Sequence, residues 1–256
     1  MKLGIIQSRG LGDIIISLPI AHNYYKQGWE IHWPISREFI PDVANHVPWV
    51  NWHAVTTDHG PFFLEQPRKI FRDLKIDQEL VLYQALTGEE FHHVNYFQHT
   101  KFDQYKYIKA GVNFLEKWQL NECITRNTQR EQELFDLVTN QLPNNTQDYI
   151  LVHLEGSDHR ADFDISIIPD DKPAVEITRM TDSIFDWLML LEKAWAVILT
   201  DSVFSNLVDQ LGLQTAESRY FIPRSHIGLT PVLGHTWTWL DNQNLDKRSE
   251  TIRVNG

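Results

Sequence analysis

Three short polar segments, each following an apolar run, carry residue types that could do chemistry. The first consists of Gly10, Leu11, Gly12 and Asp13. Two glycines between a strand and a helix let the backbone bend sharply and approach a ligand closely. A carboxylate at the start of the helix stays ionised in the field of that terminus, and it could take a proton from an attacking hydroxyl. Asp13 is therefore a candidate general base.

The same turn disfavours one function and leaves a structural alternative open. A dinucleotide-binding fingerprint, G-x-G-x-x-G, needs a third glycine where this chain has Ile15, so a nicotinamide oxidoreductase is disfavoured. Aspartate is also a favoured helix N-cap, because its side-chain oxygen accepts a hydrogen bond from an orphan N–H. A purely structural cap at Asp13 remains the alternative to a base.

The second and third segments carry groups that suit a phosphate. Thr200, Asp201 and Ser202 end an apolar run and open a helix, where main-chain N–H groups and the Ser202 hydroxyl can donate to phosphate. Residues 155–160 form a small polar segment that ends in Arg160, whose guanidinium could bind a diphosphate with two N–H groups. Each segment alone also fits an ordinary cap or a solvated loop.

Apolar runs and their spacing predict the elements that position these segments. In the first half, strands are expected at residues 3–7, 30–35 and 50–55, and helices at 13–26, 67–74, 98–118 and 128–141. Residues 79–86 fit either type. The polar residues 142–148 are the best linker candidate. In the second half, strands are expected at 149–154, 174–177, 196–199 and 218–222, and helices at 181–193 and 202–211.

This alternation predicts an α/β protein with two Rossmann-like doubly wound lobes, the GT-B arrangement, facing a central cleft. The expected domains are residues 1–145 and residues 146–256. A net charge of −11 gives no long-range attraction to nucleic acid or to an anionic membrane. A single cysteine, Cys123, fits a reducing compartment, and Arg9 and Asp13 interrupt the apolar N-terminal run. We therefore predict a cytoplasmic protein without a transmembrane segment.

Together, the segments resemble the bacterial heptosyltransferases (glycosyltransferase family 9), which add heptose from a nucleotide diphosphate to lipopolysaccharide core. The family opens with a strand, a G-x-L-G-D turn, a helix and a proline, matched here by residues 9–13 and Pro19. Its second half has a strand, a D-S/T-G turn and a helix, matched at residues 198–202, and an upstream V-E-…-M-S segment, matched at residues 175–181. The chain has Val203 and Asn206 where the family has glycine and histidine, so it resembles a divergent, shortened relative, of the sort found in phages or in surface-glycan clusters.

The resemblance implies a role for each matched residue. Asp13 would activate the acceptor in an acceptor-binding N-terminal domain, next to the turn of Gly10, Leu11 and Gly12. In a nucleotide-sugar-binding C-terminal domain, Glu176 would hold the donor ribose and the Met180 backbone would meet the nucleobase. The other implied donor-binding positions surround the sugar and the diphosphate: Ser157, Arg160, Asp201, Ser202 and Val203. The implied reaction is an inverting transfer, without metal or cofactor, from a nucleotide diphosphate sugar to a hydroxyl of a surface glycan or lipopolysaccharide-type acceptor.

Two alternatives stay open. A phage-type transferase acting on hydroxymethylated DNA bases would need a basic patch, and one helix carries Arg68, Lys69, Arg72 and Lys75, although a solvated face explains them as well. The second alternative is a non-catalytic nucleotide-sugar-binding protein of the same fold, and Val203 in place of the family's glycine favours it. A metal site is disfavoured, because the D-x-D string of residues 162–164 lies in a loop and His92, His93 and His99 lack a second set of ligands.

Overall fold

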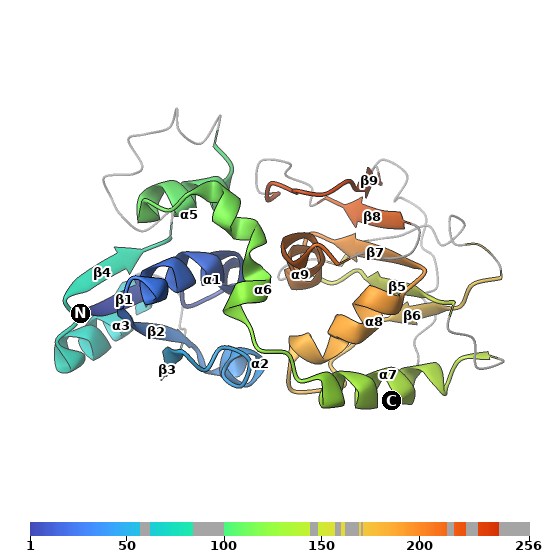
Figure 1. Cartoon of the computed structure of the whole chain (residues 1–256), viewed down its shortest axis with the longest axis horizontal. Helices are drawn as coiled ribbons and strands as arrows, with labels where there is room; N and C mark the ends of the chain where they lie inside the picture. Colours follow the sequence, from blue (N-terminus) through green and yellow to red (C-terminus); the bar gives the residue numbers. More distant parts are fainter. Residues whose placement is uncertain are drawn as a thin grey trace. The chain divides into compact units, whose positions relative to one another are not determined.

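The chain forms two compact units in the computed structural model, Met1–Thr125 and Arg126–Gly256. The structure describes residues 1–56, 62–83, 100–143, 148–156, 160–161, 169, 171–213, 218–223 and 230–240, and the side chains of residues 62 and 63 are not considered. Each unit contains one parallel sheet with helices packed on it (Figure 1). The predicted α/β class with two Rossmann-like sheets is confirmed.

The first unit contains a four-stranded sheet in the order β3-β2-β1-β4. Its strands are β1 (Lys2–Ile6), β2 (Glu30–Ser36), β3 (Val50–Val55) and β4 (Gln78–Val81). The chain leaves β1 on one side to form β2 and β3, and then returns to pair β4 with the other side of β1. The carboxyl ends of β1 and β4 therefore meet at a topological switch point, where doubly wound sheets bind their ligands.

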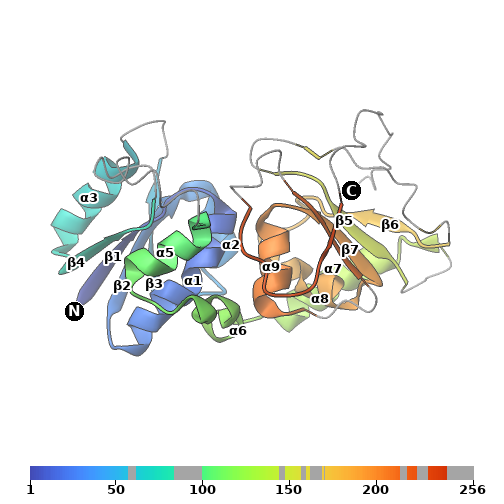
Figure 2. The same cartoon turned by 90° about the horizontal axis from the view of Figure 1, so that it is seen from above.

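Helices cover both faces of this sheet. The two helices α1 (Leu11–Lys26) and α3 (Phe62–Leu74) lie on opposite faces in both views (Figures 1 and 2). On the outer side of α1 pack α5 (Phe102–Ala110), η3 (Phe114–Trp118) and α6 (Leu120–Cys123). The single helix expected over residues 98–118 is thus two elements, because Gly111 ends α5 with a left-handed backbone (φ 64°).

The only cysteine of the sequence lies at the end of α6 in the first unit. Cys123 is buried, and its thiol donates a hydrogen bond to the carbonyl of Gln119 over 3.4 Å. Burial raises the pKa of the Cys123 thiol well above its usual range. The side chain is therefore packed as a small apolar group in its protonated form.

The second unit contains a five-stranded sheet in the order β6-β5-β7-β8-β9. Its strands are β5 (Ile150–His153), β6 (Ala174–Glu176), β7 (Ala196–Thr200), β8 (Ser218–Ile222) and β9 (Thr238–Trp239). β6 pairs with one side of β5, and β7 pairs with the other. The switch point of this sheet therefore lies between the carboxyl ends of β5 and β7.

Four helical elements pack on the second sheet or on one another: α7 (Thr128–Thr139), η6 (Ile184–Trp187), α8 (Leu188–Lys193) and α9 (Val203–Leu211). α7 contacts α8 and η6, so it belongs to the second unit. Arg126 fixes the start of this unit, since its Nε donates to Glu131 Oε1 over 2.9 Å and its Nη2 donates to Glu192 Oε2 over 2.9 Å. The contacts thus divide the chain earlier than the expected boundary at residues 145 and 146.

The short strand β9 was not expected from the sequence. Its Trp239 packs edge-on against Phe221 of β8, with ring centroids 4.9 Å apart. Next to it, the indole N–H of the buried Trp237 donates to Asp209 Oδ1 of α9 over 3.0 Å. Asp209 also accepts hydrogen bonds from the backbone N–H groups of Gly234 and His235, so one buried carboxylate connects this segment to α9.

Within the described residues, no helix has the length and apolar character needed to cross a bilayer.

Candidate functional site

The Asp13 corner, as we call the turn between β1 and α1 with its neighbours, lies at the switch point of the first sheet. Helix α1 begins at Leu11, so its N-cap is Gly10 and Asp13 is its third residue. Gly10 has a φ of 74°, and its carbonyl accepts the first helical hydrogen bond from Ile14 over 3.0 Å. The structural alternative, in which Asp13 is the N-cap, is therefore wrong, because the glycine already makes the turn that a cap residue would make.

The Asp13 carboxylate is partly open to solvent and lies directly over Gly10. Its side chain is 35% exposed. A Cβ added to Gly10 would lie 2.5 Å from Asp13 Oδ2, so only glycine lets the carboxylate take this position. The Ser17 hydroxyl donates to the Asp13 carbonyl over 2.8 Å, which fixes the first turn of α1 further.

A buried lysine that sequence reasoning missed completes this corner. Lys106 of α5 brings its ammonium within 3.1 Å of Asp13 Oδ1, and the Lys106 side chain is only 5% exposed. The ammonium also donates to Gln7 Oε1 over 2.5 Å and to the Leu82 carbonyl over 3.2 Å. Nothing in the local sequence distinguishes Lys106 from Lys109 on the same helix. Only the packing of α5 on α1 brings it to Asp13.

Tyr83 closes the corner from the end of β4. Its hydroxyl accepts a hydrogen bond from the Arg9 backbone N–H over 2.6 Å and lies 3.2 Å from Ser8 Oγ. Burial raises the pKa of the Tyr83 phenol, against the opposing effect of its hydrogen bond with Ser8. The phenol is therefore neutral at physiological pH, and it joins the ends of the two strands that flank the switch point.

The Ser202 corner is the corresponding place in the second unit, at the carboxyl ends of β5 and β7. Ser202 is the N-cap of α9, with an extended backbone (φ −149°, ψ −179°). Its hydroxyl lies 3.1 Å from Nδ1 of His153, the last residue of β5. The imidazole packs edge-on against Phe204, with ring centroids 4.7 Å apart. Sequence reasoning placed His153 in a strand and gave it no function.

The imidazole of His153 is held in its neutral form. Burial, and second the positive charge of Arg160, lower the pKa of His153 to about 4. A neutral imidazole has one ring nitrogen that donates and one that accepts. Nδ1 of His153 therefore either donates a hydrogen bond to the Ser202 hydroxyl or accepts one from it, depending on the tautomer. The corner therefore presents a hydroxyl with a fixed orientation beside the N-terminus of a nine-residue helix.

Arg160 and Glu176, predicted separately to contact phosphate and ribose, are in contact with each other. Arg160 Nη2 donates to Glu176 Oε1 over 2.6 Å, and Nη1 donates to Glu155 Oε1 over 2.9 Å. Glu176, at the end of β6, is 8% exposed. Its second oxygen, Oε2, is buried and has no hydrogen-bond partner in the described part of the chain. Glu176 thus keeps one acceptor for a donor group that none of the described residues supplies.

The remaining predicted positions lie in the second unit or outside the described residues. The Met180 N–H donates to the Thr178 carbonyl over 2.9 Å, in the segment that follows β6. Asp201 is 4% exposed, and its backbone N–H donates to the Ile222 carbonyl over 3.1 Å. Ser157, the D-x-D string and the three clustered histidines lie outside the described residues. Among the side chains that the structure describes, no three His, Cys, Asp or Glu residues gather as metal ligands would.

The sequence and the fold of the whole chain can be compared with those of known proteins. No family model and no curated protein matches the sequence. A family 9 glycosyltransferase from Veillonella parvula matches at a TM-score of 0.54, with 13% identity, over 94% of this chain and 87% of its own. ADP-heptose LPS heptosyltransferase II from E. coli matches at 0.52, with 11% identity, over 94% and 90%. An E. coli heptosyltransferase with ADP matches at 0.50, with 13% identity, over 96% and 95%.

The chain has the GT-B glycosyltransferase fold. The resemblance to family 9 that the motifs indicate is therefore matched by the fold over most of the chain, and the structural neighbours are glycosyltransferases. Within this GT-B fold, the Asp13 corner belongs to the first Rossmann-like unit and the Ser202 corner to the second.

The departure from the family pattern at Val203 leaves the second unit of the GT-B fold unstrained. Val203 is the first residue of α9, and among the described non-glycine residues only Lys75 has a positive φ. The backbone at this position therefore needs no glycine. At the second departure, the Asn206 side-chain amide donates to the Ser202 carbonyl over 3.0 Å, so it supports the first turn of α9.

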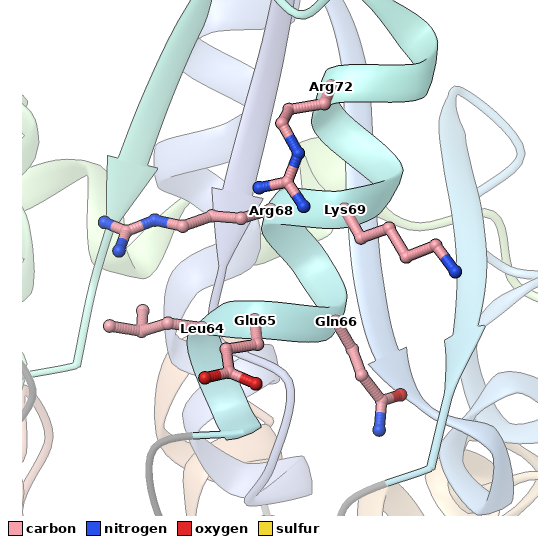
Figure 3. Close-up of a pocket in the computed structure, with 6 residues that line it drawn as sticks. All are labelled: Leu64, Glu65, Gln66, Arg68, Lys69 and Arg72. Atoms are coloured by element: carbon pink, nitrogen blue, oxygen red, sulfur yellow. The ribbon is translucent and has the colours of Figure 1, made fainter.

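The basic cluster on α3 is less uniform in charge than its sequence indicates. A groove along this helix is lined by six residues: Leu64, Glu65, Gln66, Arg68, Lys69 and Arg72 (Figure 3). Arg68 points toward β4, where its Nη2 donates to Glu79 Oε1 over 2.6 Å, and Glu65 adds a carboxylate to the groove. Two carboxylates therefore offset part of the positive charge of this surface.

Proposed function

We propose that this chain is a glycosyltransferase that moves a sugar from a nucleoside diphosphate donor to a hydroxyl acceptor, with inversion and without a metal ion. The observation that carries the proposal is the Asp13 carboxylate. It follows β1 at the switch point of a GT-B unit, remains 35% exposed, and is charge-paired with Lys106. A group at this edge of a doubly wound sheet can reach a bound ligand.

In the proposed reaction, Asp13 acts as general base. The acceptor oxygen forms a bond to the anomeric carbon while the bond from that carbon to the diphosphate oxygen breaks. The electron pair leaves with the nucleoside diphosphate, and the acceptor proton passes to the Asp13 carboxylate. A single displacement of this kind inverts the anomeric configuration.

The second unit supplies the groups that we assign to the donor. Main-chain N–H groups at the start of α9 and the Ser202 hydroxyl suit the diphosphate, since a helix N-terminus stabilises negative charge. The free Oε2 of Glu176 suits a ribose hydroxyl, which would satisfy its missing hydrogen bond. Arg160 is held by Glu155 and Glu176, so we propose that it adds positive charge near the phosphates from a fixed position.

The proposed donor is a nucleotide diphosphate sugar, and the proposed acceptor is a glycan of the surface or lipopolysaccharide type. The structural neighbours support this choice, because two of them are heptosyltransferases and one was solved with ADP. A thermal-shift screen against ADP-, UDP-, GDP- and CMP-linked sugars identifies the donor, since a ligand that binds the folded state raises Tm by mass action.

The decisive experiment replaces the proposed base. Asp13→Asn should lower turnover of the selected donor by about 10²- to 10⁴-fold, the contribution typical of a general base, while the Kd for that donor stays within about twofold. Because this variant also unpairs the buried Lys106, Asp103→Asn is the matched control. It removes the carboxylate paired with the buried Lys117, whose Nζ lies 2.7 Å from Asp103 Oδ2, and leaves the Asp13 side chain in place. Wild-type turnover in Asp13→Asn, measured per folded molecule, would end the proposal.

A further inference from the structure

Lys106 is a buried charge whose ammonium has three oxygen neighbours. A lysine ammonium has three N–H groups. Here they face Asp13 Oδ1 at 3.1 Å, Gln7 Oε1 at 2.5 Å and the Leu82 carbonyl at 3.2 Å. Gln7 and Leu82 directly follow β1 and β4, so the ammonium is fixed to the edge of the sheet. Asp13 is the only anionic partner in this set.

The two oxygens of Asp13 have different surroundings. Oδ1 meets the ammonium of Lys106, whereas Oδ2 lies over Gly10, at the place where any β-carbon would collide with it. One oxygen is therefore held by a buried cation, and the other is next to a residue without a side chain. A carboxylate held at one oxygen by a fixed partner has few rotamers left, and its second oxygen points in a defined direction.

We propose that Lys106 is the positioning residue of the general base, and that it makes Oδ2 of Asp13 the oxygen that accepts the acceptor proton. This inference rests on the proposed function. The O–H bond of the acceptor breaks, its proton passes to Oδ2, and Oδ1 stays in its ion pair with the ammonium throughout. Lys106 itself neither gains nor loses a proton.

The charge of Lys106 also distinguishes it from the other groups on the corner. The Tyr83 phenol is neutral and accepts a hydrogen bond from the Arg9 backbone N–H. The Lys106 ammonium contacts the Asp13 carboxylate directly. Removal of this ammonium should therefore change the orientation of the carboxylate and lower the rate of the chemical step.

The test uses the full-length chain and three variants. Turnover is measured as release of nucleoside diphosphate from whichever of ADP-glucose, UDP-glucose and GDP-mannose the wild type hydrolyses fastest, with water in place of the acceptor. Lys106→Met removes the charge but keeps the length of the side chain, and Lys106→Arg keeps the charge. Lys117→Met removes an equally buried lysine that is paired with Asp103 instead of Asp13.

We expect a lower kcat with little change in KM for Lys106→Met. The decrease should be on the order of 10²-fold, because a misplaced catalytic group loses about this factor. Lys106→Arg, which keeps the charge, should recover most of the rate. Lys117→Met should keep the wild-type kcat per folded molecule. A Lys106→Met variant with wild-type kcat overturns the inference, as does an equal loss in Lys117→Met.

The two proposals fail separately. Wild-type turnover in Asp13→Asn refutes the general base, whatever Lys106 does. A large loss in Asp13→Asn together with a fully active Lys106→Met refutes only the positioning role. A measurement without turnover tests the contact itself: urea midpoints of Asp13→Asn, Lys106→Met and the double variant. Asp13→Asn should destabilise the chain less when Lys106 is already Met, because no buried charge is then left unpaired. Additive midpoints would show that the pair is not coupled, and they would also overturn the inference.

Discussion

At the switch point of the first sheet a carboxylate is balanced by a buried ammonium, whereas at that of the second a neutral imidazole stands beside a helix N-terminus. Both corners lie where the strand order of a doubly wound sheet reverses. The first corner has an anion that can take a proton from a substrate. The second has donors that can bind an anion. The same sheet topology thus supports two opposite electrostatic arrangements. In the proposed reaction the first corner serves the acceptor and the second serves the donor.

The strongest test of this difference between the two corners is a substitution that moves the Asp13 carboxylate without removing a charge. Gly10→Ala should lower kcat by about 10²-fold with the donor Kd unchanged, because its Cβ takes the space of Asp13 Oδ2 and forces the carboxylate to move. Gly28→Ala is the control, since Gly28 also has a positive φ and nothing lies within 4 Å of its added Cβ. Steady-state kinetics and calorimetric titration measure both quantities. An equal loss in the two variants would mean that backbone strain, and not the carboxylate, sets the rate.

A second substitution tests whether Glu176, at the end of β6 in the second unit, binds the donor. Glu176→Gln should weaken donor binding by on the order of tenfold, because an amide replaces the charged acceptor proposed for a ribose hydroxyl. Its kcat at saturating donor should fall much less than that of Asp13→Asn. Glu155→Gln is the control, because it also loses a carboxylate bound to Arg160, but one that is 65% exposed. Unchanged donor affinity in Glu176→Gln would remove this residue from the donor site.

The neutral imidazole of His153 predicts how stability depends on pH. Its pKa in the folded chain, about 4, lies below the value of about 6.5 expected in the unfolded chain. The unfolded state therefore binds one more proton between these values. The stabilisation is complete above pH 6.5 and is lost as the pH falls toward 4. In this window His153→Gln should reduce the slope of the unfolding free energy by at most about 1.4 kcal/mol per pH unit. Urea unfolding of both proteins across the window provides the comparison, and parallel curves would contradict it.

The smallest effect is expected where the chain departs from the family pattern. Val203→Gly should change kcat and donor affinity by less than about twofold, since Val203 opens α9 without a positive φ. Its Tm should fall slightly, because glycine loses more conformational entropy on folding. A marked gain in turnover would show instead that valine hinders the diphosphate. The pair Gly10→Ala and Val203→Gly therefore tests directly which corner needs a glycine.

The sequence predicts those parts of the molecule that local patterns determine. Apolar runs located all of the described strands except β4, where residues 79–86 fitted either type, and β9, which was not expected. The turn residues located Asp13 and Ser202 at helix starts. These successes arise because helix and strand periodicity and glycine placement are local properties. Lys106 and His153 were missed for a common reason. Lys106 is 93 residues from Asp13 in sequence, and His153 is 49 residues from Ser202. Their roles come from the packing of whole elements, which single-residue patterns do not encode.

The expected division of the chain differed from the observed one for a related reason. The polar residues after α7 have the composition of a linker, whereas nothing in the sequence marks a boundary at Arg126, two residues before this helix. The contacts of α7 with α8 and the hydrogen bonds of Arg126 with Glu131 and Glu192 decide to which unit the helix belongs. The contact of Arg126 with Glu192 spans 66 residues, and arginine and glutamate are residue types that occur on any solvated helix.

The buried thiol of Cys123 makes this chain convenient for spectroscopy. Thiol-directed labels react with the exposed thiolate, and this side chain is 2% exposed with its pKa raised by burial. The native protein should therefore stay unlabelled by maleimide reagents under folding conditions. A cysteine introduced on the exposed side of α7 or α3 would then carry a fluorophore or a spin label alone, without deletion of the native residue.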